Sequence, residues 1–497
     1  MKKAAVTAIA LLGRILASAS HGTPVPRMQR ADPLLVFLEP GDARDTVGVL
    51  VYQANPLERL GAIEARLAAP ADPTAAPAAW ASFRALLPIP DGRGGYHVYG
   101  TVHRKAEKDY RWTLYRAHTP DGLRLDEFRA IFESPEGRDW LIESAMARRG
   151  DTGEYLLFTW ARSRQTQWTG HALYGFRSPD GREWEPLCPE PLYHDHDAFG
   201  VMWDARTGRL ITQQVTYQAW NKPYADNLGG QRRRVLSIRT SHEGRAWGRV
   251  PEVGQDGLII PDARDPPDIE FYRAFAFPYG DRYVAMADLY AASPLSPGAH
   301  GPHLMCEWWV SPDAVHWVRP WRELSAQGQA GYPVTMEPMW IAGRMLWWIG
   351  GAVWGLPEYR VASVGARSNA EFTSKPFRMP RGGLVLNATI AEGNGLFRQG
   401  YIMAELLGAD GKVAPGFGRG DCVLGSGDGV ALPLRWNGRT GSEMVGQEVA
   451  IRFHLRQARI YALAEAGIEA AIHSPAGGSP SGAKESPGAA GPAFSEE

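Results

Sequence analysis

Four short turns of one kind recur along this chain, and their recurrence constrains the fold more than any other feature. The strings "TPDGLRL", "SPDGREW", "SHEGRAW" and "SPDAVHW" begin at Thr119, Ser178, Ser241 and Ser311. Their starts are 59, 63 and 70 residues apart. Such self-similarity is typical of repeat architectures, in which each unit buries its apolar face against the next.

Each turn closes a unit in which apolar and polar residues alternate, as in "EYLLFTW" and "HALYGF" before Ser178. Alternation at period two predicts strands, and three or four antiparallel strands per unit are typical of a propeller blade. Five such units run from about Asp91 to Gly365. We therefore predict an all-β chain that begins with a five-bladed β-propeller. Residues 32–53 are expected to supply a strand that closes the ring, and residues 56–69 to form a helix.

The turns themselves are predicted to be scaffold. Ser or Thr and Asp or Glu cap backbone amides, Gly takes a conformation that other residues disfavour, and Trp locks the hairpin against its neighbour.

The repeat pattern ends near Ser368. After it, the strings "GYIMAELLGADG" and "EVAIRFHLRQARIYAL" predict the strands of a small β-sandwich domain. The expected organisation is a signal peptide or leader at 1–30, the propeller at 31–367, the sandwich at 368–463 and a disordered tail at 464–497.

Composition excludes several classes of function. The net charge is −1 and basic residues do not cluster, so no nucleic-acid partner is expected. No stretch is long and apolar enough to span a membrane.

The start "MKKAAVTAIALLGRILASAS" has the lysines, apolar run and small residues of a secretory signal. It predicts a secreted or periplasmic protein, otherwise a cytoplasmic one. No phosphate-binding loop or nucleophile elbow appears, and no cofactor is expected.

The repeats resemble the five-bladed glycoside hydrolase superfamily that contains families 32 and 43, the invertases and arabinosidases. The string "DPPDIEFYRAFAFPYGDRYV" is similar to a stretch of bacterial family 32-like proteins. The strings "KPFRMPRGGLVLNA" and "VAIRFHLRQARIYAL" resemble the sandwich that follows the propeller in them. The resemblance covers residues 95–463 and implies action on a carbohydrate. The invertase-type Asn-Asp-Pro-Asn/Asp signature is missing, so no nucleophile is transferred from the family.

The residues that open each unit are the ones expected to face a ligand. Glycosidic cleavage needs two carboxyl groups, one protonated and one ionised. The candidates are Glu143, Asp197, Asp268, Glu270 and Glu337. Asp268 and Glu270 are two residues apart on an extended chain and are predicted to share a face, where repulsion would separate their pKa values. In the alternative, Asp265 and Asp268 organise the turn at Pro266 and Pro267, and Glu270 pairs with an arginine such as Arg273.

Other side chains could bind the substrate beside these acids. His194 and His196 share a strand face, but no further metal ligand is identifiable, so no metal is predicted and His196 is expected to bind a hydroxyl or carboxylate. His103 belongs to the same class. Trp340 could stack on a sugar ring, and Arg273 could contact the substrate.

The leading hypothesis is a glycosidase that uses Glu270 as general acid and Asp268 or Asp197 as base or nucleophile, with Glu143 and Glu337 binding substrate. Whether the chain is an enzyme stays open. One rival is a non-catalytic carbohydrate-binding propeller, and another is a propeller that binds a protein. Acids that are each tied to an arginine would favour binding without turnover. The sugar, its linkage and the oligomeric state are not predicted.

Overall fold

The computed structural model describes residues 33–65, 83–105, 110–136, 138–162, 171–224, 228, 231–292, 303–322, 334–392 and 399–466. These residues form β-strands and short 3-10 turns with no α-helix among them, so the all-β prediction is confirmed. No helix that is long and apolar enough to cross a membrane occurs in this part of the chain. The predicted leader and nearly all of the predicted tail lie outside the described residues.

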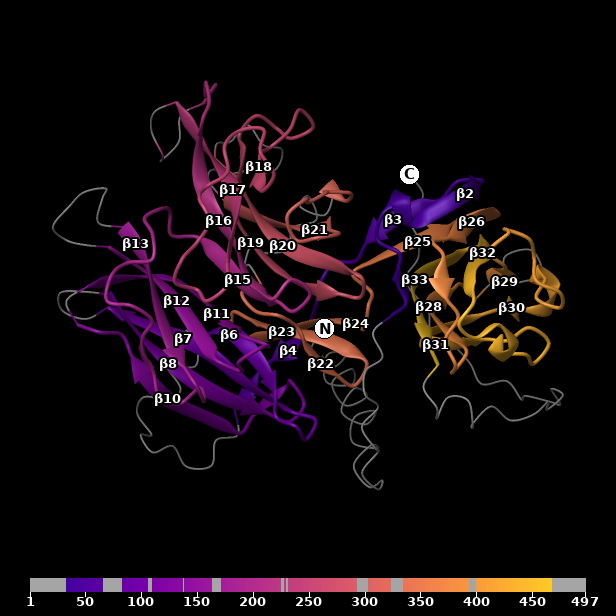
Figure 1. Ribbon diagram of the computed structural model, residues 1–497, viewed down its shortest axis with the longest axis horizontal. Helices are drawn as coiled ribbons and strands as arrows, with labels where there is room; N and C mark the ends of the chain where they lie inside the picture. Colours follow the sequence, from indigo (N-terminus) through magenta and orange to yellow (C-terminus); the bar gives the residue numbers. More distant parts are fainter. Residues whose placement is uncertain are drawn as a thin grey trace, which may run out of the picture.

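Five antiparallel sheets follow one another along the chain (Figure 1). In sheets 1 and 2 the strands are β6 (Phe83–Pro90), β7 (Tyr96–Lys105), β8 (Tyr110–Thr119) and β10 (Glu127–Glu133), then β11 (Asp139–Arg148), β12 (Tyr155–Arg162), β13 (His171–Ser178) and β14 (Glu185–Pro186). In sheets 3 and 4 they are β15 (Phe199–Asp204), β16 (Arg209–Ala219), β17 (Arg232–Ser241) and β18 (Leu258–Ile259), then β19 (Ile269–Tyr279), β20 (Arg282–Ala291) and β21 (His303–Ser311). Sheet 5 contains β22 (Met339–Ile341), β23 (Arg344–Ile349), β24 (Ala352–Pro357) and β4 (Glu58–Ala62).

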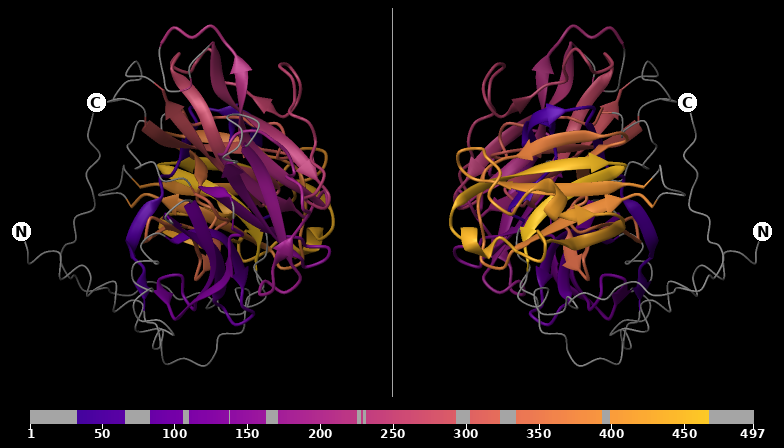
Figure 2. Two further views of the ribbon diagram at one scale, coloured as in Figure 1. Left: turned by 90° about the vertical axis from the view of Figure 1, so that its left-hand side faces the viewer. Right: turned by 90° about the vertical axis from the view of Figure 1, so that its right-hand side faces the viewer.

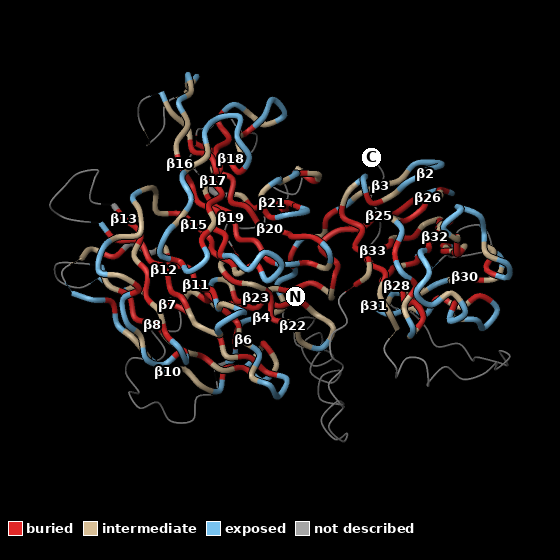
Figure 3. The backbone as a smooth tube through the Cα atoms, in the orientation of Figure 1, coloured by how far each residue is buried: buried red, intermediate tan, exposed pale blue. Residues whose placement is uncertain are grey.

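Separate apolar clusters fill the spaces between successive sheets. Sheet 1 packs on sheet 2, sheet 2 on sheet 3 and sheet 3 on sheet 4. A larger cluster joins sheets 4, 5 and 1, so the packing returns to the sheet where it began. The first strands contact one another, since β11 lies beside β6 and β15, and β15 lies beside β19. Figure 3 shows the buried backbone gathered where these sheets meet.

Two further sheets enclose a second apolar core. Sheet 6 contains β3 (Val51–Ala54), β25 (Ala362–Ala366), β33 (Ala458–Glu465), β28 (Leu384–Ile390) and β31 (Gly427–Leu434), with β1 (Leu35–Val36) paired to β33. Sheet 7 contains β2 (Ala43–Val47), β26 (Ala370–Ser374), β32 (Glu448–Arg456), β29 (Tyr401–Leu407) and β30 (Val423–Leu424), with β27 (Phe377–Arg378) paired to β32. Figure 2 (right) shows their orange and yellow strands on the face turned toward the viewer.

The N-terminal strands correct two predictions. Residues 32–53 do not close the first array, because β1, β2 and β3 pair with β33, β26 and β25 of the second pair of sheets. Residues 56–69 are not a helix in their described part, which forms β4 and β5 (Glu64–Ala65). β5 pairs in parallel with β9 (Arg124–Leu125). β4 pairs with β24, and a bulge at Leu60 accommodates the helix-like spacing of its apolar residues.

The repeated turns are scaffold, as predicted. The Gly244 amide donates to Ser241 Oγ at 2.9 Å, and the Trp247 indole donates to the Gly244 carbonyl at 2.8 Å. The Gly181 amide makes the same bond to Ser178 Oγ at 2.8 Å. Gly244 has φ of +79°, which a residue with a Cβ adopts only with strain.

We expect Gly244→Ala to lower the free energy of unfolding by roughly 1–3 kcal/mol more than Gly254→Ala. Both glycines have positive φ, at +79° and +87°, so the backbone strain is matched. A Cβ at Gly244 would lie 3.0 Å from Phe158 Cζ, whereas one at Gly254 meets no atom within 4 Å. Urea unfolding of the two variants measures the difference, and equal losses would contradict a packing role for the turn.

Candidate functional site

Acidic residues lie near the start of the first strand in several sheets. Glu143 lies within β11, Asp197 comes two residues before β15, Glu270 is the second residue of β19, and Glu337 comes two residues before β22. The first strands of sheets 1 to 4 are neighbours. The acids of sheets 2 to 4 therefore lie on or just before neighbouring strands, and their common orientation toward a ligand stays a prediction.

Glu143 lies in a buried network that joins three sheets. Its Oε2 accepts a bond of 2.7 Å from Arg84 Nη2 and a second from Arg273 Nη1. Arg273 Nε also donates to Asp288 Oδ2 at 2.7 Å. Burial alone would raise the pKa of Glu143, but the charges of Arg273 and Arg84 outweigh it and lower that pKa to about 2. Burial raises the pKa of Asp288 to about 6, against the opposing charge of Arg273.

Glu270 has other partners than the predicted Arg273. Its carboxylate is fully buried and lies 2.6 Å from Arg234 Nη1 and 3.8 Å from Lys222 Nζ. The Tyr224 hydroxyl donates to Glu270 Oε1 at 3.1 Å. Glu270 is therefore paired with an arginine, as in the alternative, but that arginine is Arg234, because Arg273 binds Glu143 and Asp288.

Asp268 is also fully buried, and its backbone carbonyl accepts a bond from the Ala292 amide at 2.9 Å. Asp265 accepts the Asp262 amide at 2.8 Å and pairs with Arg319 at 2.7 Å, as expected of a turn residue. The predicted acid–base coupling of Asp268 with Glu270 stays a prediction.

Asp197 is more exposed than Glu143, Asp268 and Glu270, with 31% of its side chain accessible to solvent. Its Oδ1 lies 2.5 Å from His196 Nδ1. The His196 ring lies 5.1 Å from Tyr217 and 6.1 Å from Tyr272, measured between ring centroids. His194 is exposed. No group of three His, Cys, Asp or Glu side chains that could hold a metal occurs among the described residues.

Tyr272 is a site residue that the sequence gave no reason to select. It is the extra residue of a bulge in β19, where the register shifts between Phe271 and Arg273. Burial raises the pKa of the Tyr272 phenol, and the charges of Asp197 and Glu143 raise it further. The hydroxyl therefore lies close enough to both carboxylates to feel their charge. We call Arg84, Glu143, Asp197, Arg234, Glu270, Tyr272, Arg273 and Asp288 the central polar cluster.

The remaining predicted residues differ in their surroundings, and both ring nitrogens of His103 are buried without a hydrogen-bond partner among the described residues. Burial, with a smaller effect of Arg84, lowers the pKa of His103 to about 4, so the ring is neutral at pH 7. The Trp340 ring packs 4.9 Å from Tyr359, and the Trp340 amide donates to the Tyr96 hydroxyl at 3.0 Å. Glu337 is half-buried. Substrate contacts of these residues stay predictions.

No family model matches the chain, and no curated protein is similar to it. Solved structures that resemble it include glycoside hydrolases, putative glycosidases and an N-acetylgalactosamine deacetylase. A putative glycosidase from Bacteroides thetaiotaomicron is 12% identical, with a TM-score of 0.35 over 55% of this chain and 86% of that one. An exo-β-1,3-galactanase from Phanerochaete chrysosporium is 11% identical, with a TM-score of 0.37 over 76% and 95%. A family 117 glycoside hydrolase from Zobellia galactanivorans is 14% identical, with a TM-score of 0.33 over 58% and 76%. TM-scores this low carry no argument about the site.

The raised pKa of Asp288 predicts a pH dependence of stability. The folded chain keeps this proton up to about pH 6, whereas an unfolded Asp loses it near pH 3.9. Stability from Asp288 is thus present at low pH and falls as the pH rises from about 4 to 6, by on the order of 2 kcal/mol. Glu143 affects stability at lower pH. Because its pKa in the folded chain is lowered to about 2, its contribution to folding stability is lost as the pH falls from about 4 toward 2.

We expect Asp288→Asn to remove this part of the pH dependence when urea unfolding is compared at about pH 4 and about pH 6.5. Glu252→Gln, at an exposed carboxyl, should leave the wild-type dependence unchanged. Identical pH slopes for wild type and Asp288→Asn would show that Asp288 is not protonated in the folded chain.

Proposed function

We propose that the chain is a glycoside hydrolase-like protein in which sheets 1 to 5 form a five-bladed β-propeller and sheets 6 and 7 a β-sandwich. The cyclic packing of the five sheets supports the propeller. β4 would complete the fifth blade from the N-terminal side. Strand pairing favours a propeller of about residues 56–357 and a sandwich of about 34–54 with 362–466, instead of a boundary between 367 and 368.

One observation carries the functional proposal: two acids from neighbouring sheets, Glu143 in β11 and Asp197 just before β15, both act on Tyr272 of β19, whose ring lies 6.1 Å from that of His196. Burial and the charges of Asp197 and Glu143 act together on the Tyr272 phenol. Saccharides are recognised by such sets of fixed charged and aromatic groups, and glycosidic cleavage needs carboxylates in distinct ionisation states.

The geometry suggests a division of roles. Asp197 with His196 would carry the proton transfer, because this pair reaches solvent. Glu143 is held ionised and would stabilise positive charge that develops on the sugar ring. Glu270, flanked by two cations, suits such an electrostatic role better than that of the general acid that the sequence suggested. Asp268, Glu337, His103 and Trp340 would then support the site from outside this group.

We expect Asp197→Asn to lower kcat on a glycoside substrate by roughly 10²–10⁴-fold, because it removes a group that moves a proton. A panel of nitrophenyl glycosides and oligosaccharides would identify the substrate, and KM should change little. Glu183→Gln, at an exposed acid in the turn after β13, is the matched control and should keep full activity. An Asp197→Asn variant with wild-type kcat would contradict this assignment.

The second candidate function is a carbohydrate-binding propeller without turnover. It is favoured by the ion pairs of Glu143 and Glu270, each of which neutralises an acid on which hydrolysis could depend. Saturable binding of a saccharide by wild-type protein that cleaves nothing in the panel would select this function. Absence of both binding and cleavage would refute both candidates.

A further inference from the structure

The end of the β16–β17 hairpin carries several cations that lie on aromatic rings. Figure 1 shows this hairpin projecting beyond the other strands of sheet 3. The Arg232 guanidinium lies 4.7 Å from the Tyr217 ring centroid, and that of Arg233 lies 4.6 Å from Trp220. The hairpin end therefore combines positive charge with flat apolar faces.

Arg233 differs from the arginines of the central polar cluster. Its Nε donates to Gln218 Oε1 at 2.9 Å, directly across the strand pair. No carboxylate forms an ion pair with it in the part of the chain that the structure describes. Its guanidinium is half-buried on Trp220 and keeps further N–H donors beyond the one that Gln218 accepts.

A chain of contacts joins Arg233 to the central polar cluster. The Trp220 ring lies 6.1 Å from the Tyr224 ring, and the Tyr224 hydroxyl donates to Glu270 Oε1 at 3.1 Å. Lys222 Nζ lies 5.6 Å from the same tyrosine ring and 3.8 Å from Glu270. A sugar bound at the cluster could therefore extend toward Trp220 and Arg233.

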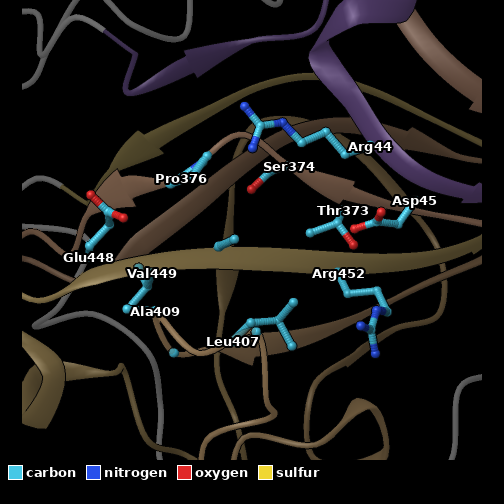
Figure 4. A pocket seen from close by; sticks show the side chains of 13 residues that line it. Arg44, Asp45, Thr373, Ser374, Pro376, Leu407, Ala409, Glu448, Val449 and Arg452 are labelled. Carbon is cyan, nitrogen blue, oxygen red and sulfur yellow. The ribbon is translucent and has the colours of Figure 1, made fainter.

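A hollow of about 180 Å³ between β2, β26 and β32 is a weaker candidate for such a ligand (Figure 4). Arg44, Asp45, Glu448 and Arg452 line it, so it offers both signs of charge. No aromatic side chain is among its described lining residues, and a sugar ring would find no face on which to stack. The hairpin end supplies that face.

We propose that the substrate or ligand is an acidic saccharide, with a uronic acid whose carboxylate is bound by Arg233 beside Trp220. This inference rests on the proposed function. A planar guanidinium matches a carboxylate with two parallel hydrogen bonds, and stacking on Trp220 fixes its orientation. In this proposal the apolar side of the pyranose ring packs on the indole face that Arg233 does not cover.

Calorimetric titration of the full chain with tetragalacturonate and with its methyl ester tests this proposal, because the ester keeps the shape and loses the charge. Wild type should bind the acid roughly 10–100-fold more tightly than the ester, the range expected for one charge-assisted contact. Arg233→Gln should abolish that preference, while Arg245→Gln, an exposed arginine beyond the other end of β17, should keep it. Arg233→Lys should weaken binding with an unchanged melting temperature, which separates recognition from folding.

The other outcomes are equally decisive. Equal affinity for acid and ester, or an Arg233→Gln variant that keeps the preference, overturns the inference. Tighter Arg233-dependent binding of a sulfated galactose tetrasaccharide overturns the uronate assignment in favour of sulfate. Binding of neutral galactotetraose alone overturns the acidic substrate but leaves the proposed function intact. No binding of any of the four saccharides, together with no cleavage in the glycoside panel, overturns both.

Discussion

One buried guanidinium, that of Arg273, holds the centre of the five-sheet array together. It binds Glu143 from sheet 2 and Asp288 from its own sheet, and Glu143 in turn binds Arg84 from sheet 1. Loss of one member leaves an uncompensated charge in the interior, which costs about 3–5 kcal/mol. Charge complementarity therefore fixes how the first strands meet, and the geometry of the candidate site depends on it.

Two antiparallel chain segments connect sheet 5 with sheet 6. One contains β3 and β4, and the other contains β24 and β25. Residues 51–54 pair with 362–365, and residues 58–62 pair with 352–355. At the junction the Asn55 amide donates to the Val361 carbonyl at 2.8 Å, and the Asn55 side chain donates to the Arg360 carbonyl at 2.7 Å. This pair of segments thus completes sheet 5 and enters sheet 6. It limits how the two groups of sheets can move against each other.

Local patterns explain why much of the fold could be predicted. Alternation at period two and the turn at Ser178, Ser241 and Ser311 depend on neighbouring residues alone, so the strands and the scaffold role of the turns followed from the sequence. The pairing of β4 with β24 joins residues about 290 positions apart in the sequence. The spacing of the apolar residues around β4 suits a helix equally well, so the local pattern could not identify this strand. Long-range pairing overrode the local preference there.

The site divides in the same way. The candidate acids could be selected because each lies near the start of a repeat unit, which is visible in the sequence, and their role toward a ligand stays a prediction. Their partners were missed, since Arg84, Arg234 and Asp288 come from other strands whose approach depends on how the sheets pack. Tyr272 was missed because a bulge, which no local pattern marks, turns it toward the carboxylates.

The ionisation of Asp288 sets the net charge of the buried group around Arg273. Arg84 and Arg273 bring two positive charges, and Glu143 brings one negative charge that persists well below pH 4. Asp288 neutralises the remaining positive charge only above its pKa of about 6. The group is therefore neutral at pH 7 and gains one positive charge as the pH falls toward 5, while Glu143 stays ionised. Between about pH 4 and pH 7 the net charge of this buried group therefore changes through Asp288, because Glu143 keeps its negative charge over that range.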